Sequence, residues 1–286
     1  MTEIQATDVI LASTVAADDT TAPRKSAWRR FEPTILGTGT IVLLLLVWQF
    51  LPDFVPMKAG TKLFFTVPSH IAGTLWTMFA TGSIWAPLGV SASAFAIGLA
   101  MAIVVGLPLG VLLGRSATLN AMVDPFITAF NATPRLVFLP LLMLWFGIGI
   151  WSKVAVVFLG ALFPLLINTY EGVRNADRLL INVVRSFGAG EWDIARLVVV
   201  PNSLPFIIVG LRLAIGRAVL GVVVSEFFGS QDGLGVVMVR AASEFKVDVV
   251  FAGLIVFAAL SLIMTGLVKL IEDRLTRWRP QHSNAG

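Results

Sequence analysis

Three charged residues, Arg212, Arg217 and Glu226, lie inside long apolar stretches of this sequence. A charge in such a stretch normally faces a polar cavity or an opposite charge, because burying it alone is expensive. An arginine in a cavity can bind an anion, so these residues are candidates for lining a translocation pathway. Arg212 can instead snorkel toward the end of its stretch, and Arg217 can pair with an acid on a neighbouring helix or a second protomer. Weaker candidates are Asn131, Arg135 and Asn168.

Glu226 has a second interpretation, because it precedes the glycine-rich run that contains Gly229, Gly233 and Gly235. Its carboxylate can stabilise a turn there instead of lining a pathway. The sequence leaves both roles open.

Catalytic chemistry has no candidate residues in this chain. The nucleotide-binding pattern G-x-x-x-x-G-K-[ST] is absent, so the usual cradle of backbone amides and lysine for ATP is missing. The chain has no cysteine, and His70 and His282 are isolated in a loop and near the C-terminus. No nucleophile–base pair or metal cluster is visible in the apolar stretches. We therefore predict no metal, no cofactor and no enzymatic activity.

A polar segment, NVVRSFGAGEWDIARLVVVP from Asn182 to Pro201, separates two apolar stretches. Its hydrophobic spacing predicts two short amphipathic helices that meet at Gly188, which can adopt the positive φ that ends a helix. Glu191 and Asp193 occupy the first turn of the second helix, where the helix dipole favours acids. Pro201 is predicted to end that helix. The two apolar faces comprise Leu179, Leu180, Val183, Val184 and Phe187, and then Trp192, Ala195, Val198 and Val199.

The composition places most of the chain in a lipid bilayer. Hydrophobic residues make up 57% and charged residues 13% of its 286 positions, and the mean hydropathy is +0.87. A helix needs roughly 20 mostly apolar residues to cross a bilayer. We predict an all-α polytopic membrane protein with six transmembrane helices. They run near residues 35–51, 88–114, 123–146, 154–170, 205–228 and 249–271.

Lysines and arginines are distributed unevenly among the predicted loops. Most lie in the N-terminal arm, in the 171–204 loop and near the C-terminus, which marks these segments and both termini as cytoplasmic. We predict a disordered cytoplasmic arm over 1–33, a transmembrane domain over 34–280 and a cytoplasmic tail over 281–286. The pI of about 9.8 then reflects membrane topology, since no aromatic-basic motif for nucleic acid is present.

Small residues recur at every fourth position of the second predicted span, namely Ala94, Gly98, Ala102, Gly106, Gly110 and Gly114. Such a row lets another helix approach closely. Because four residues advance a helix by about 400°, the row winds around the axis, and we expect it to meet different neighbours at its two ends. Kinks or interrupted helices are predicted in this and the next spans at Pro108, Pro134, Pro140 and Pro164.

The polar segment resembles the cytoplasmic EAA loop of ABC importer permeases. That loop has Glu-Ala-Ala, three residues, a glycine, nine residues and I-x-L-P, and Gly188 and Pro201 fall in register. Asn182–Val184 stand in place of Glu-Ala-Ala, and Val198 and Val200 in place of Ile and Leu. Longer stretches look like the nitrate, sulfonate and taurine type of ABC permease and together cover residues from about 85 to 280: TPRLVFLPLLMLWFGIG, LPFIIVGLRLAIGRAVLGVVVSEFFGSQDGLG and LIEDRLTRWRP.

This resemblance implies the type I ABC importer permease fold and a subunit driven by a separate cytoplasmic ATPase. It makes the segment from Glu191 to Leu197 the coupling helix that sits in a groove of the ATPase, with Trp192 as its apolar anchor. The polar rim of that helix comprises Glu191, Asp193 and Arg196. The resemblance also implies a second permease chain as a homodimer, an extracytoplasmic substrate-binding protein and the bacterial cytoplasmic (inner) membrane.

The substrate is less well defined by the sequence. Related permeases serve nitrate, taurine, alkanesulfonates, bicarbonate and pyrimidine precursors of cofactors. The two arginines favour a small anion of the nitrate, sulfonate or taurine type, and a pyrimidine-type precursor is the alternative. An ion-coupled secondary carrier is a rival function, but it normally has acidic or histidine residues in mid-span, which these spans lack apart from Glu226. A membrane-embedded enzyme is a more distant rival.

Overall fold

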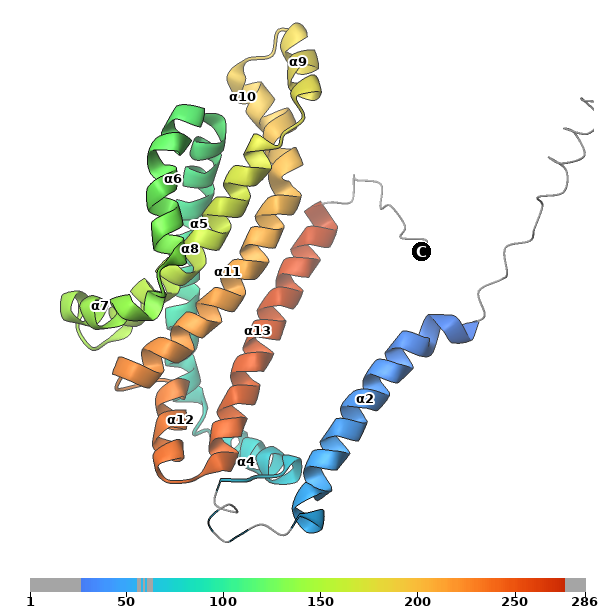
Figure 1. The fold of residues 1–286 in the computed structure, drawn as a ribbon, viewed down its shortest axis with the longest axis vertical. Helices are drawn as coiled ribbons and strands as arrows, with labels where there is room; N and C mark the ends of the chain where they lie inside the picture. Colours follow the sequence, from blue (N-terminus) through green and yellow to red (C-terminus); the bar gives the residue numbers. More distant parts are fainter. Residues whose placement is uncertain (1–26, 56–57, 59, 61–63, 276–286) are drawn as a thin grey trace, which may run out of the picture. The chain divides into compact units, whose positions relative to one another are not determined.

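The computed structural model is helical throughout its ordered elements in the part of the chain that it describes (Figure 1). That part comprises residues 27–55, 58, 60 and 64–275. The chain divides into two compact units, the first ending at Met57 and the second beginning at Lys58.

The described part of the first unit is dominated by one helix, α2 (Ala27–Phe54). Its apolar part, Ile35–Phe54, is long enough to cross a membrane and corresponds to the predicted span at 35–51. The helix begins at Ala27, within the stretch 1–33 that we predicted to be disordered. The earlier part of that stretch and the predicted tail at 281–286 lie outside the described residues.

The second unit is a bundle with α8 at its centre, packed along α5 on one side and α11 on the other. Four of its segments are long and apolar enough to cross a membrane, and they correspond to the predicted spans at 88–114, 154–170, 205–228 and 249–271. The described elements of this unit are α4 (Pro68–Ala80), α5 (Trp85–Arg115), α6 (Ala117–Ala132), the 3-10 helix η1 (Arg135–Phe138), α7 (Leu139–Phe146), α8 (Ile150–Arg174), α9 (Arg178–Ser186), α10 (Glu191–Ile194), the π-helix η2 (Ala195–Val199), α11 (Val200–Gly229), α12 (Leu234–Ser243) and α13 (Val247–Leu275).

The predicted span at 123–146 is not a single helix, and it is not among the five described helices that are long and apolar enough to cross a membrane. Helix α6 ends at Ala132, and Thr133 adopts an extended conformation with ψ of 130°, because the ring of Pro134 disfavours helical geometry in the residue before it. After η1, Pro140 falls in the first turn of α7, where its missing N–H is harmless. Pro134 thus causes the predicted interruption, whereas α5 and α8 continue past Pro108 and Pro164.

Our prediction that Pro201 ends the second loop helix is wrong. The helix runs without a break from Glu191 to Gly229, and Pro201 lies in the first turn of α11. The preceding turn is the π-helix η2, in which the N–H of Val200 donates to the carbonyl of Ala195. In a regular helix a proline lacks the N–H that would bond to the carbonyl four residues earlier, and its ring clashes with that carbonyl. The wider π turn changes the hydrogen-bond pattern just before Pro201 and so accommodates it.

The four glycines of the row on α5 all face one neighbour, α8, so our expectation of different neighbours is wrong from Gly98 to Gly114. A Cβ added to Gly98 would lie 2.6 Å from Val157, and at Gly110 it would lie 2.6 Å from Thr169. At Gly114 it would lie 2.5 Å from Val173. The partners advance along α8 in step with the glycines along α5. Two helices that pack along their four-residue rows cross at an angle, so the second helix follows the winding row of the first.

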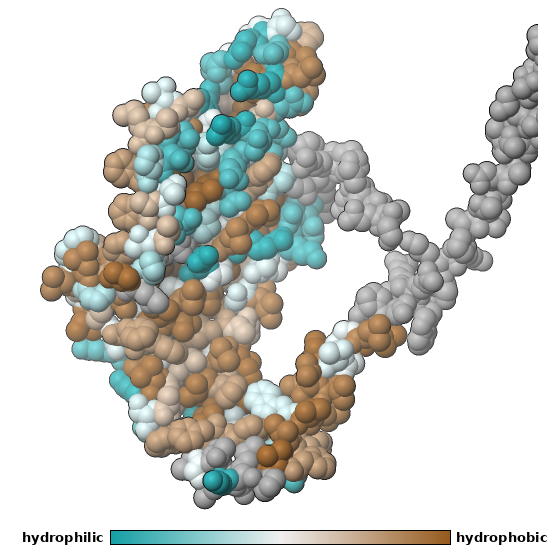
Figure 2. Space-filling model, viewed as in Figure 1, coloured by the Kyte–Doolittle hydropathy of each residue, from teal (hydrophilic) through white to brown (hydrophobic). Residues whose placement is uncertain are grey.

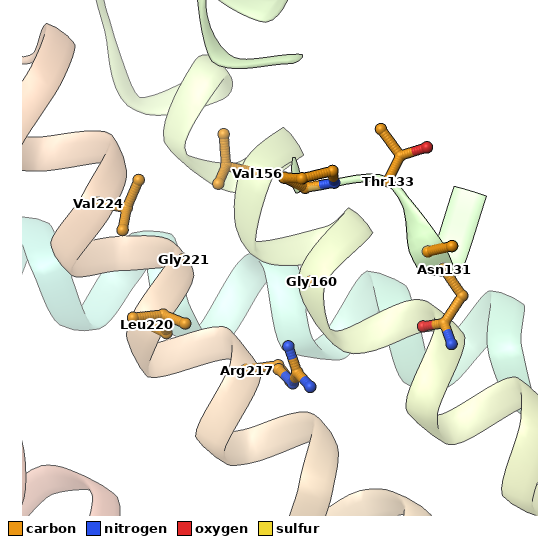
Figure 3. A pocket seen from close by; sticks show the side chains of 10 residues that line it. Asn131, Thr133, Val156, Gly160, Arg217, Leu220, Gly221 and Val224 are labelled. Atoms are coloured by element: carbon orange, nitrogen blue, oxygen red, sulfur yellow. The ribbon is translucent and has the colours of Figure 1, made fainter. Parts of the chain in front are cut away.

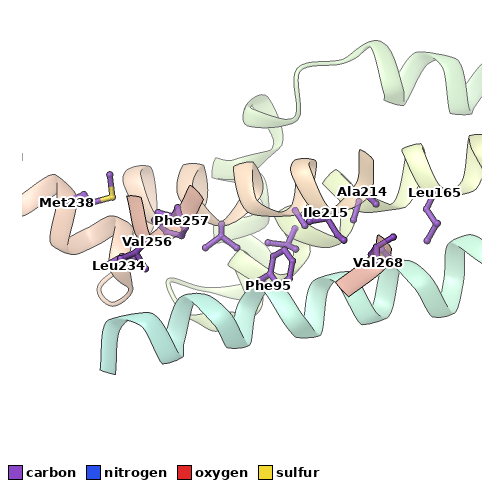
Figure 4. Packing of buried hydrophobic residues seen from close by; sticks show 14 of the residues in the cluster. Phe95, Leu165, Ala214, Ile215, Leu234, Met238, Val256, Phe257 and Val268 are labelled. Carbon is purple, nitrogen blue, oxygen red and sulfur yellow. The ribbon is translucent and has the colours of Figure 1, made fainter. Parts of the chain in front are cut away.

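The core of the second unit is shared by α5, α8, α11, α12 and α13 (Figure 4). Phe95, Val157, Leu165, Ile215 and Phe257 are among its buried side chains. Glycines also bring α8 and α11 together. A Cβ at Gly160 would lie 3.1 Å from the carbonyl oxygen of Arg217, and a Cβ at Gly221 would lie 3.2 Å from the Cα of Val157. These contacts fix α11, and Arg217 with it, against α8.

Polar and apolar residues of the second unit separate along its length. Apolar side chains cover the middle of the unit, and hydrophilic ones gather toward the end that carries α9 and α10 (Figure 2). The C-terminal ends of α5, α8 and α13 lie toward that same end (Figure 1), and each has an arginine in its last turn, namely Arg115, Arg174 and Arg274. The structure thus collects these basic residues at one end of the bundle.

Candidate functional site

Gly188 forms the turn between the two helices of the polar loop. Its φ is +83°, in the left-handed region that glycine adopts without strain. Its N–H donates to the carbonyl of Arg185 at 3.0 Å, and the N–H of Ala189 donates to the carbonyl of Val184 at 3.3 Å. These bonds close the C-terminal end of α9, so the predicted positive φ is confirmed.

Large apolar side chains of this loop are exposed in the single chain. Phe187 is 86% and Trp192 is 75% exposed, although the other side of the loop packs into a small core that contains Ile194 and Val199. Leu179 and Val183 of α9 are exposed as well. Apolar side chains left exposed at the end of the bundle where hydrophilic residues gather indicate a protein-binding surface. We call Leu179, Val183, Phe187 and Trp192 the loop surface.

The acidic residues in the first turn of α10 hold the loop in place. Glu191 accepts hydrogen bonds from Arg185 at 2.9 Å and from Arg115, at the end of α5, at 3.1 Å. Asp193 accepts a bond from the N–H of Gly190 at 3.3 Å. Both acids are engaged within the chain, whereas Arg196 is exposed beside them. The contact between Arg115 and the loop was not expected from the sequence.

Arg217 lines a cavity of about 290 Å³ between α11, α8 and the end of α6. Figure 3 shows Arg217 on α11 and, beyond Gly160 of α8, Asn131 and Thr133 near the break after α6. Its side chain is exposed, and within the described residues it forms no ion pair. Apart from Arg217, Asn131 and Thr133, the side chains that line the cavity are apolar. A cation at mid-helix that faces such a cavity can bind an anion there.

Arg212 has a different environment on the same helix. Its guanidinium lies 2.8 Å from the carboxylate of Glu272 on α13, and it does not line the Arg217 cavity. The sequence suggested snorkelling as the alternative for Arg212 and an acidic partner for Arg217, and the structure shows the acidic partner at Arg212.

Glu226 lies in a buried polar cluster, away from the Arg217 cavity. Its side chain is 2% exposed and accepts a hydrogen bond from the N–H of Gly235, in the first turn of α12, at 2.7 Å. Ser91 of α5 donates to the same carboxylate at 2.8 Å and accepts from the N–H of Leu234 at 2.9 Å. Lys153 of α8 completes the cluster, with its ammonium 3.7 Å from the carboxylate. This geometry matches the turn-stabilising role for Glu226.

The glycines after Glu226 make room for this cluster. A Cβ added to Gly233 would lie 2.1 Å from a carboxylate oxygen of Glu226, and one at Gly235 would lie 2.7 Å from its Cβ. Gly233 also has a φ of +123°. Lys153 and Ser91 were missed by sequence reasoning. The signal that could have found Lys153 is the buried acid itself, because a carboxylate in an apolar helix needs a cation nearby.

Comparison with known proteins identifies the chain. Residues 106–277 match the family described as binding-protein-dependent transport system inner membrane component. The chain belongs to this family. It is therefore a multi-pass inner-membrane permease subunit of an ABC importer, and its role is transport.

Several curated permeases are similar to this one along most of their length. The taurine transport system permease protein TauC of Escherichia coli is 30% identical over 89% of this chain and 93% of its own. The putative aliphatic sulfonates transport permease protein SsuC of Bacillus subtilis is 31% identical over 90% and 92%. The formylaminopyrimidine transport permease protein ThiX of Halalkalibacterium halodurans is 29% identical over 89% and 98%.

Solved structures agree on the fold of the permease. An inward-facing MetNI methionine ABC transporter matches with a TM-score of 0.56 at 21% identity, covering 65% of this chain and 93% of that chain. An amino acid ABC transporter crystallised with histidines matches with a TM-score of 0.55 at 18% identity, covering 73% and 100%. The predicted type I importer fold is confirmed.

Proposed function

We propose that two copies of this permease enclose a pathway for a small sulfonate-type anion, with the Arg217 cavity facing that pathway. The observation that carries the proposal is the arginine itself, which sits in a cavity at mid-helix without an ion-pair partner among the described residues. The names of two similar permeases, for taurine and for aliphatic sulfonates, support this class of substrate. The formylaminopyrimidine permease makes a pyrimidine the second candidate.

We further propose that the loop surface binds a cytoplasmic ATPase and that both termini are cytoplasmic. The exposed Trp192 and Phe187 supply the apolar contact, and the arginines at that end of the bundle support its cytoplasmic orientation. An extracytoplasmic binding protein would then deliver substrate to the opposite end, where α12 lies.

The first test is transport by the complete assembly. Vesicles that contain the permease, its ATPase and its binding protein should take up taurine or an alkanesulfonate only with internal ATP. Uptake of a pyrimidine with no sulfonate uptake would favour the second candidate. Uptake driven by an ion gradient in vesicles that hold the permease alone would contradict the whole proposal.

Arg217→Gln should abolish most transport while leaving assembly intact. A hydrogen bond to a charged group contributes about 1.5–3 kcal/mol, so uptake at low substrate concentration should fall about tenfold or more. Arg212→Gln is the matched control, because Arg212 lies on the same helix and is paired with Glu272 outside the cavity. Complex yield and uptake are measured on both variants. Full uptake by Arg217→Gln would show that this residue does not bind the transported anion.

Gly188→Val should uncouple the ATPase without preventing insertion. No atom lies within 4 Å of a Cβ added at Gly188, so the substitution acts through the positive φ, at a cost of about 1–3 kcal/mol. The strain should displace the loop surface and remove substrate-stimulated ATP hydrolysis. Gly190→Ala, at a φ of −74°, should behave as wild type. Unchanged stimulation in Gly188→Val would show that the turn does not set the coupling geometry.

A further inference from the structure

A second, larger cavity lies where the C-terminal ends of α5 and α8 meet the start of α6 and helices α9 and α10. Its volume is about 560 Å³, so it can hold a group larger than a few water molecules. It is separate from the Arg217 cavity, and the proposed transport function makes no use of it. Four arginines line it, and we call it the arginine cavity: Arg115, Arg174, Arg178 and Arg185.

The charge of the arginine cavity is not balanced by the chain. Glu191 is the one acidic residue among the described residues that line it, and it is bound to Arg115 and Arg185. Within the described part of the chain, Arg174 and Arg178 form no ion pair with a carboxylate. Two guanidinium groups therefore remain for an external anion, and guanidinium groups bind phosphate oxygens with matched geometry.

Tyr170 adds a directed hydroxyl group to the arginine cavity. Its oxygen accepts hydrogen bonds from Arg174 at 2.6 Å and from Asn120 at 3.1 Å. With both acceptor positions used, the hydroxyl proton remains available for donation. The pair of arginines and this donor form an anion-binding set on α8 and α9.

The floor of the same cavity is apolar. Leu113, Val173, Ile194 and Val199 line it with the small part of each residue, 3–7%, that is exposed in the single chain. A free inorganic anion would make no favourable contact with these apolar side chains, whereas a phospholipid carries hydrocarbon next to its charged phosphate. The cavity also lies at the ends of α5 and α8, two helices long and apolar enough to cross a membrane, so we expect it near the level of the headgroups.

We propose that the arginine cavity binds the phosphate headgroup of an anionic phospholipid from the adjacent leaflet. Arg174 and Arg178 bind the phosphate, Tyr170 donates to it, and the acyl chain begins on the apolar floor. Basic pockets between helices at the cytoplasmic surface are suited to such headgroups. Because Glu191 of the same cavity orients the polar loop, a bound lipid would stabilise the loop surface. This inference does not depend on which solute the permease carries.

The test uses the full chain, purified in mild detergent and stripped of lipid, with bound lipid counted by native mass spectrometry. Phosphatidylglycerol should bind and phosphatidylcholine should not. The double variant Arg174→Gln/Arg178→Gln should bind phosphatidylglycerol about 30-fold more weakly, because each basic residue near a membrane surface contributes roughly a fivefold gain in affinity. The double variant Lys269→Gln/Arg274→Gln removes the same two charges from α13, outside the cavity. It is the charge-matched control and should bind as wild type.

Three outcomes would overturn the proposal. Equal binding of phosphatidylglycerol and phosphatidylcholine would show that the cavity does not recognise charge. Equal binding of phosphatidylglycerol by the Arg174→Gln/Arg178→Gln variant and the wild type would show that the lipid binds elsewhere. Inorganic phosphate that protects the chain against heat as well as phosphatidylglycerol does would indicate a free anion as the ligand. If the Arg174→Gln/Arg178→Gln variant does not fold, Tyr170→Phe, which keeps the ring and removes the donor, should still weaken phosphatidylglycerol binding several-fold, and no change in Tyr170→Phe would count against the site.

Discussion

Lys153→Met should destabilise the permease by about 3–5 kcal/mol, because it leaves the buried carboxylate of Glu226 without its cation. Both side chains of this pair are almost fully inaccessible, so water cannot replace the lost partner. The carboxylate would retain its bonds to Ser91 and to the N–H of Gly235. The free energy of unfolding is measured on the purified full chain by titration with a denaturing detergent.

The double variant Lys153→Met/Glu226→Gln should recover a large part of that loss, because no unpaired charge remains in the cluster. The control is the exposed pair of Glu244 and Lys246, whose charged groups lie 2.6 Å apart. Breaking that pair should change stability by about 0–1 kcal/mol. A loss in Lys153→Met no greater than in the exposed control would show that Glu226 is neutral or hydrated in the protein.

Gly110→Leu should prevent α5 and α8 from packing and leave little folded permease. Even the Cβ would lie 2.6 Å from Thr169 and 2.9 Å from the backbone carbonyl of Leu166, and a backbone atom cannot move aside as a side chain can. Gly110→Ala should therefore already cost about 1–3 kcal/mol, the usual penalty for overpacking. Yield and detergent-induced unfolding of the full chain report both variants.

The size of the effect should follow the space at each glycine of α5. Gly106→Ala should be milder than Gly110→Ala, since its nearest atom is 3.3 Å away in the side chain of Leu162. Gly89→Ala, with no atom within 4 Å, should stabilise by about 0.5–1 kcal/mol through the better helix propensity of alanine. Equal effects at Gly89 and Gly110 would contradict the role of the close α5–α8 contact.

Features set by local chemistry were predictable from the sequence. Apolar length located the long helices, and the positive φ of Gly188 followed from the change of helical face at that position. Pro134 interrupts its span, as predicted, while Pro201 does not. The difference arises because η2 accommodates Pro201, and a π turn depends on packing that the sequence does not display.

Features that join distant segments were the ones missed. Lys153 and Ser91 lie far from Glu226 in the chain and meet it only when α5, α8 and α11 pack together. The row of small residues correctly indicated a close helix contact, but an ideal straight helix gave the wrong expectation for its neighbours, because α8 crosses α5 along the row. Sequence periodicity describes one helix at a time and says little about the path of its partner.

The uninterrupted helix from Glu191 to Gly229 has a mechanical consequence. At 1.5 Å per residue its 39 residues form a rod of about 58 Å, which carries Trp192 near one end, Arg217 along its length and Glu226 near the other. If an ATPase tilts this rod by about 10°, Arg217 moves roughly 6 Å relative to Trp192. A break at Pro201 would have added a flexible joint, so that the proposed ATPase could move the loop without moving Arg217. If the loop surface binds the ATPase and Arg217 faces the pathway, as we propose, the continuous helix from Glu191 to Gly229 links movement of the loop directly to movement at Arg217.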